Sequence, residues 1–249
     1  MTKLSVNINK IATLRNARGG NTPNLLKMAE DIQRFGADGI TIHPRPDERH
    51  IRYKDAIDLG NSVHKEFNIE GNPIDKFIDL VMLIKPTQVT LVPDDINAIT
   101  SNAGWNTKKH WNYLKSVIDE FKKAQIRTSI FVDPDLEMIE YAKKTGTDRI
   151  ELYTEEFAKK YESGEVSSIE AYAACSSLAN ELEIGVNAGH DLSLQNIEFF
   201  AKNMPYLEEV SIGHALISES IYLGIDNVIN LYIDKLNRWL LIAEYLENQ

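Results

Sequence analysis

Titratable side chains cluster directly after strand-like segments of this sequence. The stretch GITIHPRPDERH, residues 39–50, begins as a β-branched apolar run and then changes to histidine, arginine and acid within one residue. Two prolines and dense charge cannot continue a strand, so the chain leaves a sheet there and carries His43 and His50 with it. His190 and His214 follow apolar runs in the same way, in VNAGHD and SIGHA. Imidazoles titrate near neutral pH, so this set is suited to general acid–base catalysis.

Two carboxylates also lie at or near the ends of strand-like segments. Glu70 ends the run FNIE, and Glu151 lies near the end of RIELY. Histidines beside carboxylates in one basin supply several proton donors and acceptors, which a reaction with repeated proton transfers needs. Each of these residues alone is equally well interpreted as a solvated loop residue. Their joint recurrence at strand ends favours catalysis.

Glycines and arginines near the same strand ends predict an anion site. VNAGHD and SIGHA place Gly189 and Gly213 beside the ends of two strands, where barrels often bind phosphate through backbone N–H groups and a helix N-terminus. The alternative is that these glycines only allow a tight turn. Arg18 and Arg45 are expected on loops after the first two strands, available for charge-assisted contacts. We therefore expect a phosphorylated small molecule as substrate.

The elements that must position these residues alternate along the chain. Helical patterns, with apolar residues three and four apart, separate strand-like runs. Eight such units in 249 residues predict an α/β fold, a single closed (β/α)8 barrel over residues 1–249, with an open doubly wound sheet as the alternative. The strand-like runs cover residues 4–8, 39–43, 67–70, 88–93, 127–133, 149–153, 183–189 and 208–214.

Two further observations favour the barrel. FGADGITIH resembles TGTDRIELY four strands later, as half-barrel symmetry would produce. No GxGxxG opens a helix after the first strand, which removes the strongest mark of a dinucleotide-binding sheet. In a closed parallel barrel all strand ends meet on one face, so the histidines and carboxylates named above should converge.

Composition excludes several classes of partner. A formal net charge of −10 opposes nucleic-acid binding, which needs a basic face. The sequence has no run approaching the roughly 20 apolar residues that span a bilayer, so we expect no membrane partner. The single cysteine, Cys175, rules out an intramolecular disulfide framework and fits a reducing cytoplasm.

Long motifs distributed over the chain resemble the pyridoxine 5′-phosphate synthase family. They are VNINKIATLRNARGG, GADGITIHPRPDERHI, FNIEG, TLVPD, VNAGH and SIGHALI, and the resemblance runs from Val6 to about Leu223. It implies a (β/α)8 barrel with extra helices, assembled as a homo-octamer. It also implies that 3-amino-2-oxopropyl phosphate and 1-deoxy-D-xylulose 5-phosphate are joined to give pyridoxine 5′-phosphate, phosphate and water, without metal or organic cofactor.

The resemblance also assigns roles to residues. His43 and Glu70 would be proton acceptors, and His190 would be the proton donor. The matching substrate-binding positions are Asn7, Arg18, Gly213 and His214 for the aminoketone phosphate, and Arg45, His50 and Thr100 for deoxyxylulose phosphate.

Three further substrate-binding candidates depart from the family pattern. The chain has Asn9-Lys10 where the family has Asp-His, and Asp191 where the family has glycine. All three border the expected ligands. Our hypothesis is that Lys10 contacts the phosphate of deoxyxylulose phosphate as a point charge.

A metal-dependent barrel lyase or hydrolase is the alternative function, with the four strand-end histidines as ligands. The neighbouring arginines would repel a divalent cation, and no HxH or HxxxH spacing occurs. A non-enzymatic scaffold would leave the polar strand ends unexplained.

Overall fold

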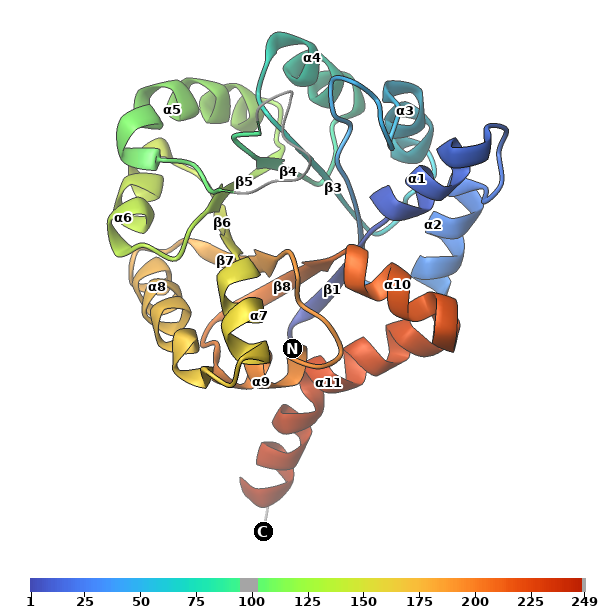
Figure 1. The fold of residues 1–249 in the computed structure, drawn as a ribbon. Helices are drawn as coiled ribbons and strands as arrows, with labels where there is room; N and C mark the ends of the chain where they lie inside the picture. The colour runs from blue at the N-terminus through green and yellow to red at the C-terminus, as the bar shows by residue number, and fades with distance from the viewer. Residues whose placement is uncertain (95–102, 248–249) are drawn as a thin grey trace.

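Eight parallel strands close into a barrel in a computed structural model that describes residues 1–94 and 103–247, and side chains up to residue 238. The strands follow one another in chain order, and β1 pairs with β8, so the sheet has no edge (Figure 1). This closure confirms the predicted (β/α)8 barrel and excludes the open sheet. The strands are β1 (Lys3–Asn7), β2 (Gly39–Ile42), β3 (Glu66–Gly71), β4 (Gln88–Leu91), β5 (Arg127–Val132), β6 (Arg149–Tyr153), β7 (Gly185–Gly189) and β8 (Leu207–Ile212).

Helices form a ring around the barrel (Figure 1). More than one helix follows β1, β6 and β8, as the expectation of extra helices requires. The helices are α1 (Asn9–Arg18), α2 (Leu25–Arg34), α3 (Tyr53–Gly60), α4 (Asp75–Ile84), α5 (Thr107–Lys123), α6 (Leu136–Thr145), α7 (Glu155–Glu162), the short η1 (Val166–Ser168), α8 (Ile169–Glu181), α9 (Ile197–Asn203), α10 (His214–Leu223) and α11 (Ile225–Glu247). Among the described helices, none is both long and apolar enough to cross a membrane.

Alternation along the strands separates an apolar outer layer from a polar barrel interior. Ile40 and Ile42 of β2 are fully buried in the main hydrophobic core, whereas Thr41 between them turns to the interior. There its hydroxyl lies 2.7 Å from the Ser5 hydroxyl of β1, and the Asn68 amide of β3 donates to it over 3.4 Å. The outer layer supplies hydrophobic stabilisation, while the interior side chains stay buried because they bond to one another.

This alternation also aims the functional side chains. Side chains two residues apart on a strand share a face, so His43 follows Thr41 and Glu70 follows Asn68 toward the barrel axis. Each pair steps from the interior to the mouth of the barrel at the carboxyl ends of the strands.

A buried ion pair fastens α1 to α3 beside this mouth. The Arg15 guanidinium is 3% exposed and donates to both carboxylate oxygens of Asp55, over 2.7 and 2.8 Å. It also donates to the backbone carbonyl of His50, and Asn16 donates to the same carbonyl over 2.8 Å. These contacts hold the loop that carries His50 in place.

Removal of Asp55 should therefore destabilise the fold strongly. Asp55→Ala leaves a buried guanidinium without its carboxylate, and we expect a loss of about 3–5 kcal/mol in the free energy of unfolding, measured in urea. Asp58→Ala in the same helix is the matched control, because its partner Lys54 is largely exposed. That control should cost no more than about 1 kcal/mol, and equal losses for the two variants would contradict the role of the buried pair.

Candidate active site

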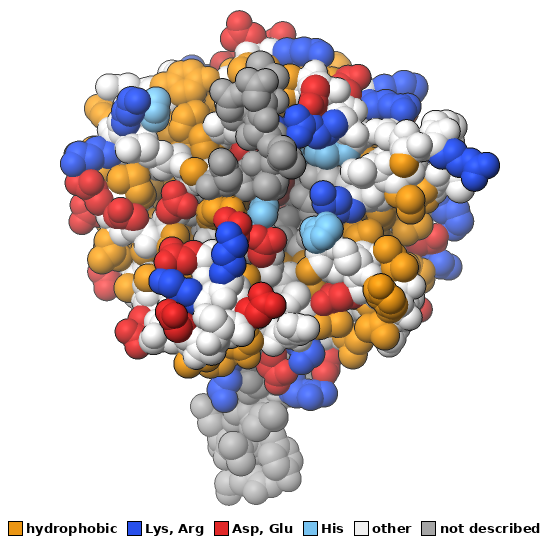
Figure 2. Space-filling model, viewed as in Figure 1, with side chains coloured by type: hydrophobic (Ala, Val, Ile, Leu, Met, Phe, Trp, Pro, Cys, Tyr) orange, Lys and Arg blue, Asp and Glu red, His pale blue; other side chains and the backbone are white. Residues whose placement is uncertain are grey.

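A cavity of about 550 Å³ lies at the carboxyl ends of the strands. Figure 2 shows histidine and basic side chains around a hollow in this face. The structure brings eleven of the thirteen predicted site residues to the cavity lining, and Glu151 with them. They are Asn7, Asn9, Lys10, His43, Arg45, His50, Glu70, His190, Asp191, Gly213 and His214.

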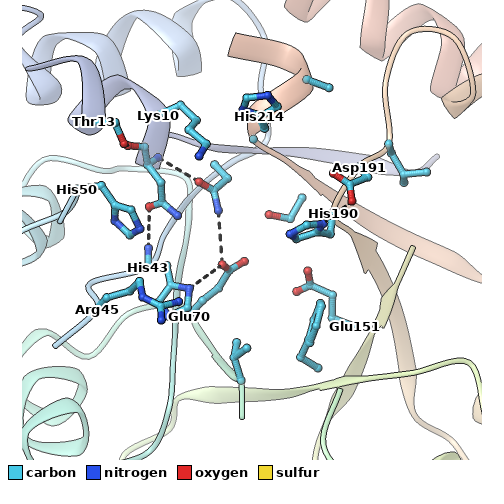
Figure 3. Close-up of a pocket in the computed structure, with 18 of the residues that line it drawn as sticks. Lys10, Thr13, His43, Arg45, His50, Glu70, Glu151, His190, Asp191 and His214 are labelled. Carbon is cyan, nitrogen blue, oxygen red and sulfur yellow. Dashed lines mark hydrogen bonds and ion pairs between the residues drawn. The ribbon is translucent and has the colours of Figure 1, made fainter. Parts of the chain in front are cut away.

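Two predicted site residues are not among them. Arg18 was expected on a loop, but α1 continues through it, and its side chain is exposed at the far end of that helix, outside the cavity lining. Thr100 lies outside the described residues. Lys10 was expected directly after the first strand and instead lies in the first turn of α1, with its side chain beside the cavity (Figure 3).

His43 leaves β2 into a network of polar contacts. Its backbone N–H donates to the Asn9 side chain over 2.9 Å, which anchors the end of β2 to the start of α1. Its ring lies 3.9 Å from a Glu70 oxygen and 3.7 Å from an Asp94 oxygen, beyond hydrogen-bond length. Burial lowers the pKa of His43 to about 3, and the positive charge of Arg45 adds to this. The ring is therefore neutral and able to accept a proton.

His50 is held as a neutral ring in the same loop. Its Nδ1 accepts from the backbone N–H of Ile51 over 2.9 Å, so its proton is carried on Nε2. Burial lowers its pKa to about 3, followed by the charges of His43, Arg45 and Lys10. An uncharged N–H donor beside cationic side chains is suited to binding an anion.

Glu70 of β3 and Glu151 of β6 line one cavity (Figure 3), where Glu151 is buried and the Glu70 side chain is 13% exposed. Burial raises the pKa of Glu70 well above its usual range, and the neighbouring Glu151 and Asp94 charges raise it further. Burial likewise raises the pKa of Glu151, while His190 opposes this shift. Gly189 makes room for Glu151, since a Cβ there would lie 2.5 Å from its Oε1. The site therefore favours the protonated form of both carboxyls more than solvent does.

The remaining predicted residues lie at the ends of β7 and β8. Gly213 is the N-cap of α10 and His214 is its first residue. A Cβ on Gly213 would lie 3.2 Å from Asn7, so glycine permits close contact between β8 and β1. The start of a helix offers unpaired backbone N–H groups and positive potential, which favours a phosphate there.

Asp94 is a site residue that was not singled out from the sequence. It follows β4 in TLVPD, and its carboxylate accepts from Arg45 over 2.7 Å while both side chains are nearly fully buried. The motif was visible, but the pairing joins residues 49 positions apart and only the fold reveals it. The unpredicted residues that line the cavity itself are Thr13, Arg49, Val92, Phe131, Leu192, Ser211 and Ala215.

Comparison with known proteins gives the family. A profile described as "Pyridoxal phosphate biosynthesis protein PdxJ" matches residues 4–238. The chain belongs to this family. It is 70% identical over 236 residues to a pyridoxine 5′-phosphate synthase of Flavobacterium johnsoniae, covering 95% of this chain and 100% of that one. It is 60% identical over 232 residues to the enzyme of the same name from Bacteroides fragilis strain YCH46, covering 93% and 98%.

Solved structures with low sequence identity share only the fold. N-(5′-phosphoribosyl)anthranilate isomerase from Pyrococcus furiosus gives a TM-score of 0.63 at 10% identity, covering 96% of this chain and 100% of that one. 3-Keto-L-gulonate-6-phosphate decarboxylase from Vibrio cholerae gives a TM-score of 0.64 at 8% identity, covering 95% of this chain and 98% of that one.

Among the described residues, no group of three His, Cys, Asp or Glu side chains has the arrangement of a metal site.

The buried carboxyl pair leads to a spectroscopic prediction. Because a raised pKa means that the folded protein retains a proton that an exposed carboxyl releases, the substrate-free protein should show a protonated-acid C=O infrared band at neutral pH. The difference spectrum between the protein and its Glu70→Gln variant should contain this band. Glu156→Gln, a largely exposed carboxylate on α7, is the control and should leave it unchanged. A Glu70 difference spectrum without the band would show that Glu70 is ionised.

Proposed function

We propose that this protein condenses 3-amino-2-oxopropyl phosphate with 1-deoxy-D-xylulose 5-phosphate and closes the ring to give pyridoxine 5′-phosphate, phosphate and water. The observation that carries this proposal is one cavity in which neutral His43 and Glu70 lie on one side and Glu151 lies beside His190 on the other (Figure 3). Family membership and the names of the relatives support the same activity. No metal or organic cofactor takes part in the proposed reaction.

The proton donors and acceptors that line the cavity fit this chemistry. Joining an amine to a ketone, eliminating phosphate and water, and forming an aromatic ring require proton transfers in both directions. Neutral His43 can accept the first proton. Glu70, once it has given up its own proton, becomes a stronger base than an exposed glutamate because its pKa is raised. His190, on the other side of the cavity, is the proposed proton donor.

Basic groups in the cavity suit two phosphorylated substrates despite the acidic chain. Arg45, His50 and Lys10 lie close enough together for the two cations to lower the pKa of His50. They form the proposed site for deoxyxylulose phosphate, and Thr100, which lies outside the described residues, is proposed for it from the family motif alone. Asn7, Gly213 and His214 gather at the start of α10 and form the proposed site for the aminoketone phosphate. Arg18 is proposed for the second site from the family motif alone.

We also propose a cytoplasmic homo-octamer. Exposed apolar side chains on α10 support a subunit contact: Ile221 is 78% and Tyr222 is 88% exposed. The single cysteine, Cys175, is free and buried, which fits a reducing compartment.

The activity is tested by incubating the purified protein with both phosphorylated substrates. Formation of pyridoxine 5′-phosphate, identified by mass and absorbance, together with one equivalent of inorganic phosphate, is the expected result. Phosphate release without the ring product, or turnover that a chelator abolishes, would refute the proposal and favour a metal-dependent lyase or hydrolase.

Glu70 should be essential for turnover but not for folding. Glu70→Gln keeps the size of the side chain and removes the base, so kcat should fall at least about 100-fold while the thermal midpoint is preserved. The control Glu156→Gln should retain normal turnover. A Glu70→Gln enzyme with near-normal kcat would exclude Glu70 as a base in the reaction.

Lys10 should discriminate between the two substrates. Lys10→Ala removes an ammonium beside His50, so the KM for deoxyxylulose phosphate should rise about tenfold, as expected for a lost charged hydrogen bond, while that for the aminoketone stays constant. Lys27→Ala, which removes a largely exposed side chain of α2, is the control and should change neither KM. Equal changes for both substrates, or none, would remove Lys10 from the proposed phosphate site.

A further inference from the structure

His190 is held at the edge of the cavity by an unusual turn. Both His190 and Asp191 have left-handed backbones, with φ of 79° and 57°, a region that non-glycine residues rarely adopt. Thr154, fully buried after β6, donates its hydroxyl to the carbonyl of Gly189 over 2.7 Å and also contacts the carbonyl of His190. The Tyr153 ring packs against the imidazole, edge to face, with 5.1 Å between centroids. Residues at the end of β6 thus fix both the backbone and the ring of His190.

The turn folds the Asp191 side chain back onto the ring of the preceding residue. Its Oδ2 lies 2.8 Å from His190 Nδ1 (Figure 3 shows the two side chains together). The hydrogen bond to His190 lowers the pKa of Asp191, so the group is a carboxylate at neutral pH. A carboxylate only accepts hydrogen bonds, so Nδ1 must carry the hydrogen that it shares with Asp191. The proton that His190 exchanges in a reaction is then the one on Nε2.

We propose that Asp191 is a positioning residue that fixes the tautomer and orientation of His190 for proton transfer. The kinetic part of this inference rests on the proposed function, whereas the tautomer does not. It replaces the expectation that Asp191 is a substrate-binding residue, because both substrates carry phosphate and a carboxylate beside a phosphate is repelled by it. The glycine that the family pattern has at this position has no side chain with which to make this contact.

The charges around the pair are consistent with this role. Lys159 on α7 and His214 on α10 both lower the pKa of Asp191, which favours its ionised form. Glu151 faces His190 from β6 inside the cavity. The His190 side chain is 26% and that of Asp191 37% exposed, so solvent weakens their bond until a ligand fills the cavity.

The tautomer can be measured without substrate. In ¹⁵N-histidine-labelled protein, His190 should carry its hydrogen on Nδ1, and its resonances are assigned by their loss in His190→Asn. In Asp191→Gly the ring should shift toward the Nε2–H tautomer that isolated imidazole prefers. Glycine adopts a φ of 57° without strain, so this variant should fold. Glu156→Gln is the control for a lost carboxylate on the same rim and should leave the tautomer unchanged.

Kinetics test whether the contact serves the reaction. Asp191→Gly should lower kcat about 10- to 100-fold, the range known for partners that orient a histidine, while the KM of both substrates stays constant. Added formate should restore part of kcat by occupying the place of the carboxylate. Asp191→Asn, which keeps an acceptor oxygen and tolerates the left-handed turn, should lose less activity than Asp191→Gly.

Three outcomes would overturn the inference: an unchanged His190 tautomer in Asp191→Gly, an unchanged kcat, or a rise confined to the KM for the aminoketone phosphate. The last would make Asp191 a substrate ligand. If the unmodified protein formed no pyridoxine 5′-phosphate, the proposed function would fail, and the tautomer comparison would still decide the role of Asp191.

Discussion

Burial of ionisable side chains at the mouth of the barrel is the constraint on which this site depends. Loss of water penalises the charged form of each group, and it therefore raises the pKa of Glu70 and lowers that of His43. Burial thus favours the neutral form of each group, although arginines and carboxylates surround them. A neutral imidazole can accept a proton from a substrate and a protonated acid can donate one, so burial favours both functions that a multistep condensation needs.

The rest of the structure keeps these ionisable side chains buried and correctly positioned. The apolar outer faces of the strands provide hydrophobic stabilisation, so the barrel interior can contain buried polar side chains such as Thr41 and Asn68. At the mouth of the barrel, the Asn9 side chain accepts a hydrogen bond from the backbone N–H of His43. Asp94 forms an ion pair with Arg45, and both side chains are nearly fully buried. Loss of either partner of the Arg45–Asp94 pair would leave a buried charge uncompensated and would destabilise the protein. These supporting contacts are therefore as necessary as the groups that face the substrate.

Local sequence pattern predicted the barrel and placed the histidines and carboxylates of the candidate site at strand ends, whereas Asn7, Asn9, Lys10 and Asp191 were named from the resemblance to the family. Apolar, strand-like runs that change to charged residues placed His43 and Glu70 at strand ends, and a closed parallel barrel requires those ends to meet on one face. Arg18 could not be placed in this way, because only the length of α1 carries it away from the cavity. The partnership of Arg45 with Asp94 and the turn that brings Asp191 onto His190 depend on tertiary contacts and left-handed dihedrals, which no periodicity encodes.

Neutron diffraction of the substrate-free protein in deuterated buffer would show where the resting site holds its protons. At neutral pH we expect a deuteron on the Glu70–Glu151 carboxyl pair and a deuteron on only one ring nitrogen of His43. Deuterons on both nitrogens of His43 beside ionised carboxyls would contradict this expectation, because the site would then be an ion pair stabilised by charge rather than a neutral cluster created by burial.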